Sequence, residues 1–120
     1  NEGRKIMHLP ELRVNCTCVR VPTMRSHSES ITVEFERPLS PDEARAILED
    51  APGIKVVDNP AELQYPMPLD TSDQDLIYVG RIREDLSADK DTHALTFFCC
   101  GDQIRKGAAT NAVQIAEYLL

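Results

Sequence analysis

Residues 30–53 read SITVEFERPLSPDEARAILEDAPG, and this stretch predicts a β-strand that is followed directly by a helix. Apolar and polar residues alternate over 30–36, with Ile31, Val33 and Phe35 on one face. Such alternation is typical of a strand that is buried on one side only. The sequence therefore predicts a sheet with one face on a core and the other in water.

The helix predicted after this strand has clear signals at both of its ends. Ser40 can cap it, Pro41 suits its first position, and Glu43 can complete a capping box. The apolar stripe that would face the core is Ala44, Ile47 and Leu48. The Ala-Pro-Gly sequence at 51–53 ends the helix.

The remaining segments extend this pattern in both directions along the chain. Further strands are predicted at 13–21, 54–57, 76–83 and 93–100, and a second helix at 103–119. The three prolines between 58 and 75 predict a long connecting loop that is neither helix nor central strand. We therefore expect an α+β fold in a single domain, 1–120, with a mixed, mainly antiparallel sheet and helices on one face.

Composition limits the kinds of protein that this chain can be. It has 120 residues and a net charge of −7, enough for one domain and unfavourable for binding nucleic acid or an anionic membrane surface. Neither an apolar run long enough to span a membrane nor a signal-peptide core is present, so we expect a cytoplasmic protein. The non-Met first residue and the apolar last residues suggest a piece of a larger chain.

The four cysteines occur as a C-x-C pair, Cys16 and Cys18, and a C-C pair, Cys99 and Cys100. Neither spacing is that of a zinc knuckle, so no metal site is expected. Both pairs lie in apolar runs, which favours reduced thiols with a structural role.

The segment 18–29 is the part of the chain that folding explains least, because it places two arginines and a histidine close to a proline. The planar guanidinium of Arg20 can bind a carboxylate or a phosphate with two hydrogen bonds. His27 can transfer a proton near neutral pH, and Ser28 or Glu29 could set its tautomer. The alternative is a polar connection with solvated charges.

The block Thr17-Cys18-Val19-Arg20-Val21-Pro22 with His27-Ser28-Glu29 resembles a segment of the aspartate-semialdehyde dehydrogenases. Further matches, in family order, are Ala51-Pro52-Gly53, Tyr65-Pro66, Val79-Gly80-Arg81-Ile82-Arg83 with Asp85, Arg105-Lys106-Gly107-Ala108-Ala109 and Asn111-Ala112-Val113-Gln114-Ile115-Ala116-Glu117. They cover nearly the whole chain. The resemblance is to the carboxy-terminal part of that enzyme only, from late in the catalytic and dimerisation domain through the terminal helix.

This resemblance implies a fold like the C-terminal domain of glyceraldehyde-3-phosphate dehydrogenase, and an enzyme of lysine, threonine and methionine biosynthesis. The family reduces β-aspartyl phosphate to aspartate semialdehyde with NADPH, through a cysteine thioester, and releases phosphate. By position, His27 matches the acid/base histidine, Arg20 the residue that binds the α-carboxylate of the substrate, and Gln103 a residue that contacts NADP. A helix N-terminus with Arg105 and Lys106 nearby would also suit an anionic cofactor.

The resemblance further implies a homodimer or homotetramer, and a separate NADP-binding domain against which 103–120 would pack. The family nucleophile lies upstream of the matched part, and the register set by Arg20 and His27 makes neither Cys16 nor Cys18 that nucleophile. The 120 residues alone are thus expected to be inactive. Many relatives carry Gly where this chain has Ser26. The alternative hypothesis is a non-catalytic dimerisation or scaffold module, or an inactive paralogue, favoured by the small-residue face of the last helix and the Pro-rich loop.

Overall fold

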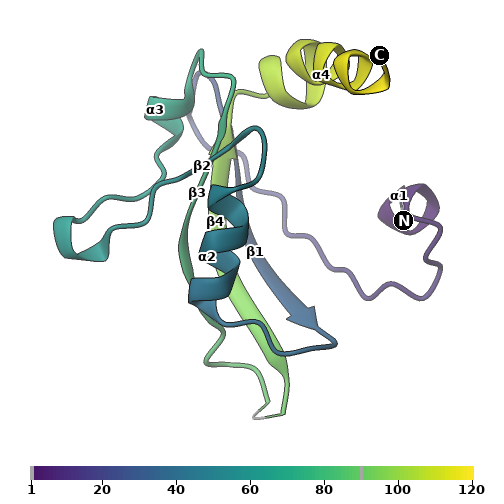
Figure 1. Cartoon of the computed structure of the whole chain (residues 1–120), viewed down its shortest axis with the longest axis vertical. Helices are drawn as coiled ribbons and strands as arrows, with labels where there is room; N and C mark the ends of the chain where they lie inside the picture. Colours follow the sequence, from purple (N-terminus) through teal and green to yellow (C-terminus); the bar gives the residue numbers. More distant parts are fainter. Residues whose placement is uncertain (1, 90) are drawn as a thin grey trace.

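The computed structural model describes residues 2–89 and 91–120, and these residues contain a four-stranded sheet (Figure 1). The strands are β1 (His27–Phe35), β2 (Ile54–Val56), β3 (Ile77–Glu84) and β4 (His93–Gly101), in the order β1-β4-β3-β2. β4 is antiparallel to both β1 and β3, whereas β2 is parallel to β3. The predicted α+β class with a mixed, mainly antiparallel sheet is confirmed.

The helical elements differ in how closely they pack on the sheet. They are α1 (Glu2–Ile6), α2 (Pro41–Glu49), η1 (Pro60–Glu62), α3 (Pro68–Thr71), the irregular turn η2 (Arg105–Ala109) and α4 (Thr110–Leu119). α2 lies across one face of the sheet, where it contacts β2 and β3. α4 lies at one end of the sheet, and α1 lies apart from the sheet at the end of an extended segment (Figure 1).

The core forms between α2 and the sheet face that it covers. Its buried members are Ala44, Val79, Ile82 and Leu95. The register places Val33 opposite Leu95 and Ile31 opposite Phe97, so the alternation predicted for β1 does direct apolar side chains to one face. A fully buried leucine such as Leu95 contributes about 1.5–3 kcal/mol to folding.

α2 begins as the sequence predicts. The Oγ atom of Ser40 accepts a hydrogen bond from the Glu43 amide at 3.2 Å, and Glu43 Oε2 accepts one from the Ser40 amide at 2.9 Å. Both halves of the capping box are therefore present. Gly53, with φ of +80°, then turns the chain into β2.

A bulge in β3 accounts for two of the short motifs in the sequence. Arg81 has φ of +55°, and Asp58 holds it there by accepting a hydrogen bond from the Arg81 amide at 2.8 Å. The preceding residue must be glycine, since a Cβ atom on Gly80 would lie 2.1 Å from the carbonyl oxygen of Val57 and 2.7 Å from Pro66. The Tyr-Pro and Val-Gly-Arg motifs thus meet where the loop after β2 lies against β3.

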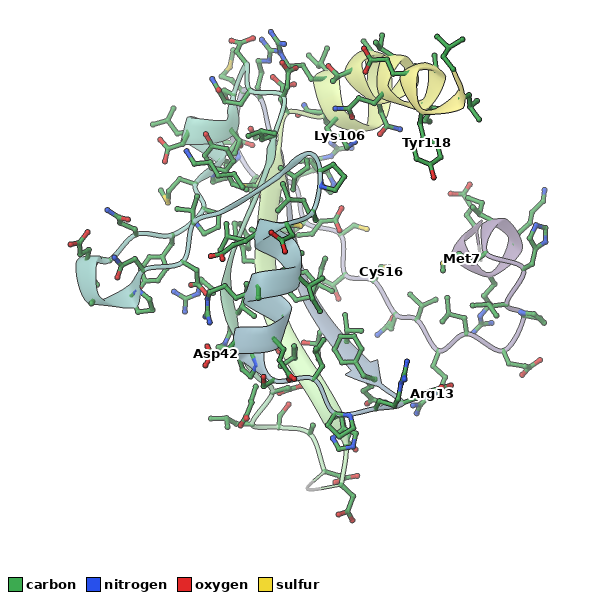
Figure 2. The ribbon with its side chains drawn as sticks, viewed as in Figure 1. Met7, Arg13, Cys16, Asp42, Lys106 and Tyr118 are labelled. Atoms are coloured by element: carbon green, nitrogen blue, oxygen red, sulfur yellow. The ribbon has the colours of Figure 1, made fainter. Side chains whose placement is uncertain are left out.

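The strand predicted at 13–21 is wrong for this chain. Residues 12–23 are extended but form no strand, because no neighbouring strand in the described ranges gives them a ladder of hydrogen bonds. An ion pair of 2.7 Å between Arg13 and Glu34 ties the segment to β1. Figure 2 shows Arg13 and Cys16 beyond β1, and both Cys16 and Cys18 are exposed rather than buried.

The last helix also begins later than the predicted residue 103, since α4 starts at Thr110. The Asp102 carbonyl accepts hydrogen bonds from the amides of Arg105 and Lys106, and Gly107 at φ of +86° then breaks the helical path. Similarly, the loop predicted at 58–75 contains two short helical pieces, η1 and α3. A proline stands at or beside the first position of each, where it favours a helix start.

Candidate functional site

A cavity of about 320 Å³ lies where β1 begins and β4 ends. Its lining includes His27 and Glu29 from β1, Gln103 after β4, and Lys106 from η2. Two of the three site residues predicted from the sequence, His27 and Gln103, therefore share one cavity. Lys106 is labelled in Figure 2, at the end of the sheet beside α4.

His27 is the first residue of β1 and pairs with Gly101, the last residue of β4. Its side chain is 65% exposed, so the imidazole can reach a ligand in the cavity. The Nδ1 atom lies 3.4 Å from Glu29 Oε1, which gives the protonated ring a carboxylate partner. Of the two neighbours that could set the tautomer, Glu29 is the one in position.

The residue before His27 connects it to Gln103. The Ser26 amide donates a hydrogen bond of 2.8 Å to Gln103 Oε1, and Ser26 Oγ lies 2.7 Å from Thr71 Oγ1. Ser26 is buried and has φ of +81°, in the left-handed region that favours glycine. This geometry gives a physical reason for the glycine that the family resemblance implies at this position.

An ion cluster anchors the same loop one residue further back. Arg25 pairs with Asp73 and, at 2.7 Å, with Asp102, whose side chain is fully buried. Burial raises the pKa of Asp102, but hydrogen bonds from the amides of Asp73 and Ile104, with the Arg25 charge, outweigh it and hold that pKa below its usual range. The arginine of the loop 22–26 thus pairs with carboxylates of this chain, whereas the alternative of a polar connection predicts a solvated charge.

Cys99 and Cys100 line the cavity near His27 as free thiols. Burial raises the pKa of Cys99 to about 11, with a further contribution from the Glu29 carboxylate. A thiol with so high a pKa is a poor nucleophile at neutral pH. Cys99 therefore fits the structural role that its sequence context predicts.

The third predicted residue, Arg20, does not join this cavity. It lies in the extended segment 12–23 and is exposed, and no hydrogen bond or ion pair links it to His27 or Gln103 in the described residues. Gln103 is in the cavity but not at a helix N-terminus. Of the two cations nearby, Arg105 pairs with Asp75 at 2.8 Å, so only Lys106 faces the cavity.

Sequence reasoning noted Ser26 only as a departure from the family's glycine, and it missed Thr71, Asp73 and Asp102. Ser26 is separated from its partner Gln103 by 77 residues and from Thr71 by 45, so no local pattern could reveal these contacts. Within 2–89 and 91–120, no group of three or more His, Cys, Asp or Glu residues could hold a metal ion. Among the same residues, no helix is long and apolar enough to cross a membrane.

Comparison with known proteins gives consistent matches. The family model described as semialdehyde dehydrogenase, dimerisation domain, matches residues 1–106. The aspartate-semialdehyde dehydrogenase of Prochlorococcus marinus is 55% identical over 120 residues, which are 100% of this chain and 34% of that protein. The enzyme of Aquifex aeolicus is 50% identical over 119 residues, covering 99% of this chain and 34% of its own length.

A solved structure is also similar. Aspartate semialdehyde dehydrogenase II of Vibrio cholerae, complexed with ASA, superimposes with a TM-score of 0.85 and 38% identity, covering 98% of this chain and 34% of that one. The chain thus spans about a third of the length of the relatives it matches.

The chain therefore belongs to the semialdehyde dehydrogenase family and matches the dimerisation domain of that family. Within the family it is similar to a portion of the aspartate-semialdehyde dehydrogenases, so the resemblance carried by its short motifs is confirmed. The alternative of a non-catalytic scaffold is not favoured, because these relatives are enzymes.

Proposed function

We propose that this chain supplies one side of the active site of an NADPH-dependent aspartate-semialdehyde dehydrogenase. The observation that carries the proposal is the placement of His27 and Gln103 on one cavity wall, joined through the Ser26 amide. The rest of the site, including the nucleophilic cysteine, would come from the two thirds of the relatives' length that this chain does not match.

In the proposed reaction, a cysteine thiolate attacks the acyl carbon of β-aspartyl phosphate, and phosphate leaves. The resulting thioester accepts a hydride, and the thiohemiacetal collapses to aspartate semialdehyde and free thiolate. His27 would take the proton of the thiol and later supply one to the developing oxyanion. The Glu29 carboxylate, 3.4 Å from Nδ1, would stabilise the imidazolium that forms in between.

Arg20 would bind the α-carboxylate of the substrate. Its guanidinium carries no ion pair within the described residues, so it is free to bind a carboxylate with two hydrogen bonds. For Arg20 to reach the site, segment 12–23 must lie against the unmatched part of the enzyme. The exposed apolar residues Val19 and Val21 support such a contact.

The residues around the cavity fit one edge of NADP. Gln103 and Asn111 offer amides, Lys106 offers a cation, and Gly107 leaves open space, since nothing lies within 4 Å of a Cβ atom built there. NADPH, when bound, supplies the hydride. This chain would orient the cofactor through Gln103, whose Oε1 is already held by Ser26.

We also propose that α4 packs on the NADP-binding domain and that the enzyme is a homodimer or homotetramer in the cytoplasm. Of the elements of this chain, α4 packs mainly on η2, and Val113, Ile115 and Tyr118 are exposed. Tyr118 is labelled in Figure 2. The match to a dimerisation domain supports the oligomer. The four free thiols support a reducing compartment.

The test uses a full-length hybrid enzyme in which residues 1–120 replace the matching third of the Prochlorococcus relative. His27→Ala should lower kcat by about 10²- to 10⁴-fold, the usual contribution of an acid/base group. The matched control is His93→Ala, since His93 is also exposed and also begins a strand. Full turnover by the His27 variant would overturn the proposal.

A further inference from the structure

We infer that Asp102 is a positioning residue that sets the placement of both His27 and Gln103. This inference rests on the proposed function, and it gives a role to a residue that touches neither substrate nor cofactor. Asp102 does not line the cavity. Its side chain is fully buried, although an unpaired charge in that position would be costly.

Both oxygens of the Asp102 carboxylate have bonding partners in neighbouring segments. Oδ2 accepts a hydrogen bond from the Asp73 amide at 2.8 Å and forms an ion pair with Arg25 at 2.7 Å. Oδ1 accepts a hydrogen bond from the Ile104 amide at 2.9 Å. The carboxylate thus joins three segments that are distant in sequence: the loop before β1, the turn after α3, and the turn after β4.

The route from Asp102 to His27 is short. Arg25 stands two residues before His27, and the buried Ser26 between them has a fixed backbone at φ of +81°. The imidazole is 65% exposed, and among the described residues its one ion-pair partner is Glu29 on the same strand, so its position depends on the backbone that carries it. Holding Arg25 therefore holds the start of β1.

The connection from Asp102 to Gln103 is shorter still, because the two residues are adjacent in sequence. The Ile104 amide bonds to the Asp102 side chain, and the amides of Arg105 and Lys106 bond to the Asp102 carbonyl at 3.1 and 2.9 Å. These bonds fix the turn that carries Gln103 and direct its Oε1 to the Ser26 amide at 2.8 Å. One carboxylate thus fixes the proposed proton-transfer group and the proposed cofactor contact relative to each other.

The test is Asp102→Asn in the full-length hybrid enzyme. An amide has a single acceptor oxygen, so it cannot serve both the Asp73 and Ile104 amides, and it loses the Arg25 ion pair. The matched control is Asp75→Asn, which makes the same charge change at a half-exposed residue that pairs with Arg105 instead.

We expect Asp102→Asn to lower kcat by about 10- to 100-fold, the cost of misplacing a reacting group by about 1 Å. The KM for the acyl phosphate should stay within about threefold, because substrate binding is assigned to other residues. A purely structural role would instead lower the yield and the melting temperature, and leave kcat per folded enzyme unchanged. Asp75→Asn should change neither constant by more than about twofold.

The outcomes separate this inference from the proposed function. If His27→Ala is inactive while folded Asp102→Asn keeps the parent kcat, the positioning role is wrong and the proposed function stands. If His27→Ala is fully active, the proposed function is wrong, whatever the result for Asp102→Asn. If Asp102→Asn does not fold, Arg25→Lys tests the positioning role instead, because it keeps the charge but loses the guanidinium geometry. A lowered kcat of Arg25→Lys would support the role, and an unchanged kcat would contradict it.

Discussion

At the residue scale, Ser26 combines an unfavourable backbone conformation with a favourable side-chain contact. A non-glycine residue at its φ of +81° costs about 1 kcal/mol or more. Its hydroxyl group regains about 0.5–1.5 kcal/mol by a buried hydrogen bond to Thr71. Ser26 is therefore tolerated at a position where glycine would be relaxed.

This balance predicts which of two substitutions at Ser26 lowers the free energy of unfolding more. Ser26→Ala loses the hydrogen bond and keeps the strain, so it should lower the free energy of unfolding by about 1 kcal/mol. Ser26→Gly loses the same bond but relieves the strain, and should therefore be the more stable of the two. Urea unfolding of both variants of the hybrid enzyme measures this difference. An alanine variant more stable than the glycine variant would contradict the account.

Arg20 gives a second prediction at this scale. If it binds the α-carboxylate of the substrate, Arg20→Ala should cost on the order of 2–4 kcal/mol of transition-state binding. That cost corresponds to a fall in kcat/KM of roughly 30- to 900-fold. The control is Arg13→Ala, in the same exposed segment but paired with Glu34. Equal kcat/KM values for the parent and Arg20→Ala would count against the role.

The residues found from sequence and those missed differ in one physical respect. His27, Arg20 and Gln103 could be named because their surrounding motifs are contiguous and match a family. Ser26 and Asp102 act through partners that are distant in sequence, 77 and 29 residues away in the contacts to Gln103 and Asp73. Such contacts depend on the folded topology, so a local pattern does not contain them.

At the element scale, the beginning of α2 provides a test of stability and its pH dependence. Ser40→Ala removes the cap, and should lower the free energy of unfolding by about 1 kcal/mol at neutral pH. Ser40→Thr keeps a hydroxyl acceptor and is the matched control. Equal destabilisation by the two substitutions would show that the hydroxyl does not cap the helix.

The pH dependence follows from the same contact. Hydrogen bonds from the Ser40 hydroxyl and amide lower the pKa of Glu43 below its usual 4.5 in the folded state. Their contribution is therefore complete above the pKa of the unfolded chain, and it is lost as the pH falls through the lower folded value. Glu43→Gln should flatten this part of the stability profile on the acid side of the usual glutamate pKa of 4.5.

Elements with local signals were predicted well, and elements that need a distant partner were not. Residues adjacent in sequence carry the signals for the capping box, for the alternation of β1 and for the strands β3 and β4. The segment 12–23 alternates equally well, yet a strand also requires a neighbour for its backbone groups. α4 starts at Thr110, later than predicted, because Asp102 and Gly107 form a separate turn before it.

At the scale of the whole molecule, several of the most exposed apolar residues lie in the parts that leave the sheet, although Ile47 of α2 is also 60% exposed. Met7, directly after α1, and Tyr118 of α4 are 61% and 91% exposed, and Figure 2 shows both away from the sheet. Under the proposed function, this surface would contact the part that corresponds to the other two thirds of the relatives' length. This arrangement fits a site that is divided between two parts of one enzyme.

The measurement that tests this claim most directly compares the chain alone with the full-length hybrid enzyme. Both are assayed for phosphate-dependent reduction of NADP by aspartate semialdehyde, the reverse of the biosynthetic direction. We predict turnover by the hybrid enzyme and none by the 120 residues alone, since the nucleophile is assigned to the unmatched part. Activity of the isolated chain, or a folded hybrid enzyme that is inactive, would contradict the account.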